Sequence, residues 1–325
     1  MKYRADSLVR RDALLLILLV ILVIIGLSGL TMATGWREVK ASLGALSVLQ
    51  IIALLGLTIC NFVLRSLRWH IFTRALDIPI GVWSNIRLYL AGLLMIVTPA
   101  RIGELVRLRW LGRESNRPLE VTTPLVVLDR ASDLLAVAVL LLLCLGAGSG
   151  ISVALPAAGF ALVMAFLVTQ PLILASLLKL IWRMIGRWPQ IFIKARRAIK
   201  SLTIFSRPSV LITTLGLGGI GWFAEGVSFW LLLEWMNADI GLWSAITIFV
   251  LAMLTGGATG MPGGLGGAEV ALIALLTLHG VPLEIAAPAT AVIRLTTLWF
   301  AIAIGFIVSP MAEEASRKAL DAVEK

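Results

Sequence analysis

Charged residues are scarce in this chain. Asp, Glu, Lys and Arg together make up only 14% of the 325 residues, whereas apolar residues make up 59%. A soluble domain usually has about a quarter of its residues charged. The composition therefore predicts one integral membrane domain over residues 1–325, with no extramembrane region large enough to form a second domain.

Cysteine and histidine are also rare, and their placement argues against several kinds of chemistry. Cys60 and Cys144 both lie in apolar segments, so we expect neither a disulfide framework nor a thiolate metal site. His70 and His279 lack a second ligand at metal-binding spacing. No Ser/His/Asp or Cys/His arrangement stands out, and no Gly-Lys-Ser/Thr follows the glycines. We expect no metal, no cofactor, no nucleic-acid partner and no enzymatic activity.

Long apolar runs are what the chain has in abundance. Residues 13–34 are apolar without a break, which is enough to cross a hydrocarbon core of about 30 Å and too long for a cleaved signal. The predicted spans are 13–34, 43–64, 122–146, 151–182, 208–235 and 286–309. We therefore predict an all-α polytopic membrane protein with about six transmembrane helices.

Two further apolar stretches are each divided by proline and glycine. They are 88–98 followed by 102–112, and 245–257 followed by 267–280. Each arm is too short to cross a bilayer and long enough to enter it and return, so we predict two re-entrant helical hairpins. Two short tilted spans in each place are the alternative.

Four landmarks recur in the same order about 164 residues apart. They are Ile80-Gly81-Val82-Trp83-Ser84 with Ile240-Gly241-Leu242-Trp243-Ser244, Pro99 with Pro262, Glu104 with Glu269, and Pro124…Arg130 with Pro288…Arg294. This pattern predicts an internal duplication, with one repeat at about 43–146 and the other at about 208–309. In a membrane protein such an architecture usually places a binding site between the halves.

The basic residues predict an orientation. Segments 1–12, 65–87, 101–117, 183–207 and 311–325 hold 23 of the 28 Lys and Arg residues. This bias predicts that both termini are cytoplasmic. The two hairpins then enter from opposite faces, which makes the repeat inverted. Residues 184–200 mix bases with apolar residues and predict an interfacial linker helix on the cytoplasmic side.

Arg130 and Arg294 are the charges least expected in a membrane. Each lies about eight residues, or roughly 12 Å, into a predicted span, and the two occupy equivalent repeat positions. Ionisable groups at such depth are costly and mark functional sites by default. Glu104 and Glu269, at the hairpins, are the expected counter-charges.

Asp129 and Asp133 flank Arg130 and are further candidates for this site. Two interpretations remain open. The carboxylates and arginines form buried ion pairs that lock each hairpin to a span, or the arginines bind an anionic headgroup through their planar donors while the carboxylates gate them.

Glycines crowd the turn of the second hairpin, at Gly263, Gly264 and Gly266 among others. Such a turn lets backbone approach a ligand, and the following helix start offers N–H groups to an anion. A tightly packed hairpin without a ligand is the alternative. Arg65 and Arg68 share one helix face at the predicted cytoplasmic end of the second span. With Arg101 they predict an access point for a headgroup.

Several of these motifs together resemble a known family. The motifs are Arg65-Ser66-Leu67-Arg68-Trp69, Pro99-Ala100-Arg101-Ile102-Gly103-Glu104, Asp129-Arg130-Ala131-Ser132-Asp133 and Pro262-Gly263-Gly264-Leu265-Gly266…Glu269, followed by Arg294. In this order they resemble the flippase-like membrane region of lysylphosphatidylglycerol synthetases and its stand-alone relatives, over about residues 10 to 310.

The resemblance implies movement between leaflets of an anionic phospholipid or a lipid-linked, polyprenyl-phosphate-type precursor. Asp129 stands where the family pattern Glu-Arg-x-x-Asp has Glu. The synthetases carry an aminoacyl-transferase domain, and this chain stops at Lys325, so we expect no aminoacylation of lipid.

We therefore expect a lipid flippase or scramblase in a bacterial-type inner membrane. Arg130 and Arg294 would hold the phosphate in turn, Glu104 and Glu269 would compete for them, and Asp133 could carry a coupling proton. A homo-oligomer and a separate lipid-modifying enzyme are possible partners. An integral membrane enzyme acting on a lipid-linked substrate and a small-solute or ion transporter are the alternatives.

Overall fold

The computed structural model describes residues 40, 43–98, 104–185 and 207–323. All regular structure in these ranges is helical, which confirms the all-α class. Within them, Val48–Ala75, Pro208–Trp235 and Leu283–Ala322 are long and apolar enough to cross a membrane. The predicted first span, 13–34, and nearly all of the predicted linker helix, 184–200, lie outside the described residues.

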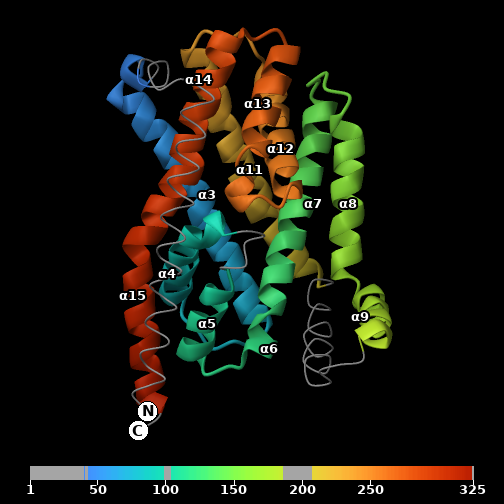
Figure 1. Cartoon of the computed structure of the whole chain (residues 1–325), viewed down its shortest axis with the longest axis vertical. Coiled ribbons are helices and arrows are strands. Elements are labelled where there is room, and N and C mark those ends of the chain that lie inside the picture. The colour runs from blue at the N-terminus through green and yellow to red at the C-terminus, as the bar shows by residue number, and fades with distance from the viewer. Residues whose placement is uncertain (1–39, 41–42, 99–103, 186–206, 324–325) are drawn as a thin grey trace.

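Two helices of 28 residues each, α3 (Val48–Ala75) and α11 (Pro208–Trp235), cross at the centre of the molecule (Figure 1). Ser47 begins α3 with a capping box, in which its hydroxyl accepts from the Gln50 amide and the Gln50 side chain accepts from the Ser47 amide. Proline at the first position begins α11. The two helices make the most extensive contact of any pair in the described part of the chain.

Two shorter helical hairpins lie toward opposite ends of the long axis (Figure 1). The first consists of α4 (Val82–Gly92), the 3-10 turn η1 (Leu93–Val97) and α5 (Glu104–Ser115). The second consists of α12 (Leu242–Ala258), the 3-10 turn η4 (Pro262–Gly264) and α13 (Gly267–Leu278). The helices α5, α12 and α13 fall where three of the four short apolar arms were predicted, whereas the arm predicted at 88–98 is the end of α4 followed by η1.

The other helices surround this frame. They are α6 (Leu119–Thr122), α7 (Pro124–Gly146), α8 (Ala154–Thr169), α9 (Pro171–Ile185), α14 (Leu283–Arg294), the π-helical turn η5 (Leu295–Trp299) and α15 (Phe300–Val323). The predicted range 208–235 coincides with α11, and 122–146 differs from α7 by two residues at its start.

Three predicted spans need correction. The range 151–182 is two helices, because Gln170 is extended (φ −82°, ψ 109°) ahead of Pro171 and a residue before proline disfavours the helical region. The range 286–309 continues through α15 to Val323. The range 43–64 continues to Ala75, because the arginines that follow residue 64 find partners inside the protein.

The contact between α15 and the first hairpin is the closest one found at a glycine in the described part of the chain. Gly305 of α15 lies against Leu94 of η1, and a Cβ on this glycine would overlap the Leu94 backbone nitrogen. Trp69, Phe72 and Leu108 are buried beside this seam, so the hairpin is anchored on both sides.

We expect Gly305→Ala to lower stability by about 1–3 kcal/mol, the usual cost of overpacking, because the clash is with backbone and cannot be relieved by a rotamer change. The control is Gly216→Ala on α11, where a Cβ meets nothing within 4 Å. Thermal unfolding of the purified protein in detergent measures both, and equal melting temperatures would contradict the predicted contact.

Candidate functional site

A cavity of about 720 Å³ lies between the two halves of the chain. Its charged lining residues are Arg65, Arg107, Arg130, Asp133, Glu225 and Arg294. Apolar side chains and glycines of the second hairpin form much of the remaining wall. Phe160 of α8 and Met261, which precedes η4, also line the cavity and are each more than half exposed. The cavity therefore reaches the outer surface of the protein.

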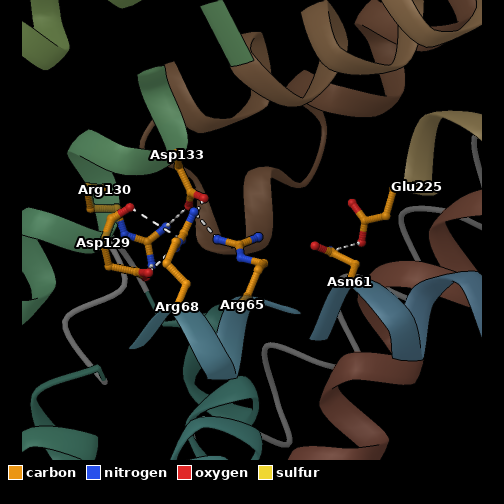
Figure 2. Close-up of polar contacts among 7 residues, drawn as sticks. All are labelled: Asn61, Arg65, Arg68, Asp129, Arg130, Asp133 and Glu225. Atoms are coloured by element: carbon orange, nitrogen blue, oxygen red, sulfur yellow. Dashed lines mark hydrogen bonds and ion pairs between the residues drawn. The ribbon is translucent and has the colours of Figure 1, made fainter. Parts of the chain in front are cut away.

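Three arginines and two aspartates form a cluster on one side of the cavity (Figure 2). The Nη2 atom of Arg68 donates to Asp129 Oδ1 at 2.6 Å and lies 2.8 Å from Asp133 Oδ1. Arg65 donates to the other oxygen of Asp133. Arg130 lies 3.6 Å from Asp133 and 3.8 Å from Asp129. Because three guanidinium groups share two carboxylates, the cluster retains a positive charge.

Helical spacing explains this cluster. Arg65 and Arg68 are three residues apart on α3, and Asp129 and Asp133 are four apart on α7, so each pair shares a face. Gly218 of α11 leaves space for the Arg68 guanidinium, since a Cβ at this position would lie 2.8 Å from Arg68 Nη1. Arg68 is fully buried, and its carboxylate partners offset the large cost of removing its charge from water.

Two residues of the predicted access point, Arg65 and Arg68, belong to this cluster. Arg68 is 0% exposed, and the Arg65 side chain is 15% exposed, so both lie in the interior. Arg107, another base counted as cytoplasmic, is also buried, with its guanidinium 3.7 Å from the Trp69 ring and 5.0 Å from the Tyr89 ring. Three of the bases on which the predicted orientation rests, Arg65, Arg68 and Arg107, therefore lie inside the protein.

Arg294 forms the second charged centre. Its Nε donates to Glu269 Oε1 at 2.5 Å, and its Nη2 donates to the Gly263 carbonyl at 2.7 Å. The predicted pair of Glu269 with Arg294 is thus present. Gly263, Gly264 and Gly266 all have positive φ, between 60° and 80°, so they shape the turn that presents this carbonyl.

Arg130 and Arg294 line the same cavity, from α7 in the first half and α14 in the second. Their environments differ, because the Arg130 side chain is 31% exposed and the Arg294 side chain is 4% exposed. Arg101 lies outside the described residues, and although Glu104 begins α5, its side chain is outside them too. The pair of Glu104 with Arg130 stays a prediction.

The cavity also includes three residues that were not predicted from the sequence, namely Glu225, Asn61 and Arg107. Glu225 is 7% exposed and accepts a hydrogen bond from Asn61 Nδ2 at 2.6 Å (Figure 2). A signal for it existed, because it is an acidic residue in the middle of the predicted span 208–235. Arg107 had no such signal, since it lies in a hairpin arm rich in arginine.

The charged side chains of the cavity wall are guanidinium groups and carboxylates. Within the residues that the structure describes, no group of three or more His, Cys, Asp and Glu could hold a metal ion. What the arrangement offers a ligand is guanidinium donors, which suit a phosphate oxygen in bidentate geometry.

Comparison with known proteins matches the chain to a family and to two relatives. The family described as Lysylphosphatidylglycerol synthase TM region matches residues 14–305. A protein of Methanothermobacter thermautotrophicus named UPF0104 membrane protein is 26% identical over 323 residues, covering 90% of this chain and 95% of that protein. A second match of the same name and organism is 30% identical over 115 residues, or 34% of each chain.

We expect Asp129→Asn to destabilise the protein by about 3–5 kcal/mol, the cost of removing one partner of a buried ion pair. The exposed Asp321→Asn is the matched control and should leave stability unchanged. Thermal unfolding in detergent compares the two variants. If Asp129→Asn melted at the wild-type temperature, the cluster would not hold α3 to α7.

Proposed function

Because the chain belongs to the family of the lysylphosphatidylglycerol synthase TM region, a membrane family with a lipid-related function, we propose that it moves an anionic lipid between leaflets. The observation that carries the proposal is that Arg130 and Arg294 line the same cavity. An anionic phospholipid or a polyprenyl-phosphate-type precursor supplies the phosphate that such donors bind.

An inverted repeat is part of this proposal. The hairpins α4/α5 and α12/α13 lie toward opposite ends of the molecule in Figure 1. After α3 and α11 the backbone repeats in detail, with a positive φ at Asp77 (53°) and Asn237 (57°) and a glycine cap before the next helix at Gly81 and Gly241. Two copies of one unit, inserted in opposite directions, would give alternating access to a shared site.

The headgroup alone would occupy the cavity. A volume of about 720 Å³ is in the range of small-molecule sites. Because the cavity reaches the surface beside Phe160 and Met261, the acyl or prenyl chains would stay in the bilayer while the headgroup passes. No covalent bond of the lipid changes in this mechanism, and a separate enzyme would make the lipid.

The carboxylates would gate the arginines. In the structure Glu269 holds Arg294 at 2.5 Å, whereas the distances from Arg130 to Asp129 and Asp133 are 3.6–3.8 Å. Arg130 is thus the more accessible of the two and would receive the phosphate first. Transfer to Arg294 would then require the phosphate to displace Glu269.

We propose an inner-membrane location with both termini cytoplasmic.

Two variants separate lipid binding from structural locking. Arg130→Gln removes a partly exposed guanidinium, and the double variant Arg294→Met/Glu269→Met replaces a buried ion pair with apolar groups, which often leaves stability unchanged. Losing a charged hydrogen bond of roughly 1.5–3 kcal/mol predicts roughly ten- to hundredfold slower lipid movement. A fluorescent phosphatidylglycerol in proteoliposomes measures it.

Arg183→Gln on α9, where the arginine is exposed, is the control and should move lipid at the wild-type rate. Wild-type rates in both test variants, with the protein folded, would end this mechanism. Chemical conversion of the lipid would favour an enzyme. Uptake of a solute without lipid movement would favour a solute transporter.

A further inference from the structure

We propose that Glu225 and Asn61 form a proton-binding site in the cavity, and that a proton accompanies the anionic lipid. The inference rests on the proposed lipid movement and names the ion coupled to it. It is carried by the geometry of one carboxylate that, unlike its neighbours, has an amide for a partner (Figure 2).

Glu225 lies in the interior of α11, lines the cavity and is 7% exposed. Its carboxylate accepts from Asn61 Nδ2 at 2.6 Å. In the described part of the chain it forms no ion pair with a Lys, Arg or His side chain within 4.0 Å. A carboxylate in such a place is costly to keep ionised, so taking up a proton offsets part of its desolvation.

The other carboxylates of the site are held differently. Asp129 lies 2.6 Å from an Arg68 nitrogen, Asp133 lies 2.8 Å from the same guanidinium, and Glu269 lies 2.5 Å from Arg294. Contact with a guanidinium favours the ionised form of a carboxyl group. We therefore place the proton on Glu225 rather than on Asp133.

Asn61 suits a group that changes protonation state. Its amide donates to an ionised carboxylate and can accept from a carboxylic acid, whereas a guanidinium can only donate. The side chain is buried, at 1% exposure, and its Oδ1 has no hydrogen-bond partner among the residues that the structure describes. This oxygen faces α11, where a Cβ on Gly221 would come within 2.5 Å of it. The side chain that contacts Glu225 through its amide nitrogen therefore also carries an acceptor oxygen that is not in use.

The charges that face Glu225 come from three elements. Arg65 of α3 lies between Asp133 and Glu225 in Figure 2, Asp133 belongs to α7, and Arg294 belongs to α14. The remaining neighbour, α12, carries no ionisable side chain. Arg65 already donates to Asp133, so its charge is shared between the two carboxyl groups.

Protonation changes the charge that a phosphate meets. Four arginines and two carboxylates line the cavity among the described residues, and a proton on Glu225 removes one of the two negative charges. Phosphate binding and protonation then favour each other, and by linkage each raises the affinity for the other equally. A phosphodiester with one negative charge and one proton would cross together without moving net charge.

The step is an acid–base exchange at one atom. A water-borne proton on one side of the membrane binds a Glu225 carboxylate oxygen, and the same O–H bond breaks when the site opens to the other side. No oxidant, reductant or further co-reactant is needed.

Proteoliposomes with fluorescent phosphatidylglycerol and a trapped pH-sensitive dye test the proposal. In the wild type, a pH gradient with the acidic side where the lipid starts should speed lipid movement several-fold and carry protons with it. In Glu225→Gln the ratio of rates with and without the gradient should fall to about one, whatever the rate itself, because the amide takes up no proton.

Glu234→Gln is the matched control, since Glu234 is an exposed carboxylate near the end of the same helix, and it should keep the wild-type ratio. Asn61→Ala keeps the carboxyl group and removes its partner, so the pH of half-maximal movement should shift while the gradient still acts. This second variant tests the site even if Glu225→Gln does not fold.

A wild-type rate that ignores the gradient, or a gradient effect that survives in Glu225→Gln, would overturn the proton site while leaving lipid movement intact. Absence of lipid movement in the wild type at every pH would instead refute the proposed function, and the proton site with it.

Discussion

Arg68 is a fully buried guanidinium whose two carboxylate partners connect α3 to α7, next to α11. It extends from α3, pairs with Asp129 and Asp133 of α7, and occupies space that Gly218 leaves on α11. Leaving such a charge without partners would cost several kcal/mol per ion, so the three helices can come together in few ways. The contact therefore limits how α3, α7 and α11 pack beside the cavity.

The charged residues of the site differ in how closely their partners hold them. Arg65 and Arg68 are held by short contacts and serve the packing of the helices. Arg130 keeps 31% of its side chain exposed and lies 3.6–3.8 Å from its aspartates. Arg294 is intermediate, since it faces the cavity but is held by Glu269 and the Gly263 carbonyl. Glu225 differs from all of these, because its hydrogen-bond partner in the described part of the chain is the Asn61 amide.

Much of the helical layout could be predicted because its signals are local. Pro208 and the apolar run after it begin and fill α11, and Pro124 does the same for α7. The prediction failed where a local signal was overlooked or misleading. Pro171 divides the predicted span 151–182, and the arginines after residue 64 suggested a helix end although α3 continues to Ala75. An arginine ends an apolar run in the sequence, but the helix can continue past it when the arginine pairs with a buried carboxylate.

From the sequence alone, Arg130 and Arg294 could be selected as candidate site residues because of their apolar context and spacing, and the structure places both at one cavity. The pair of Glu269 with Arg294 was also within reach, because hairpin and span are neighbours along the chain. Only the tertiary structure decided that Arg65 and Arg68 face inward, and that Glu225 meets Asn61 across 164 residues. Such pairings depend on which helices cross and at what register, and helical periodicity carries no information about either.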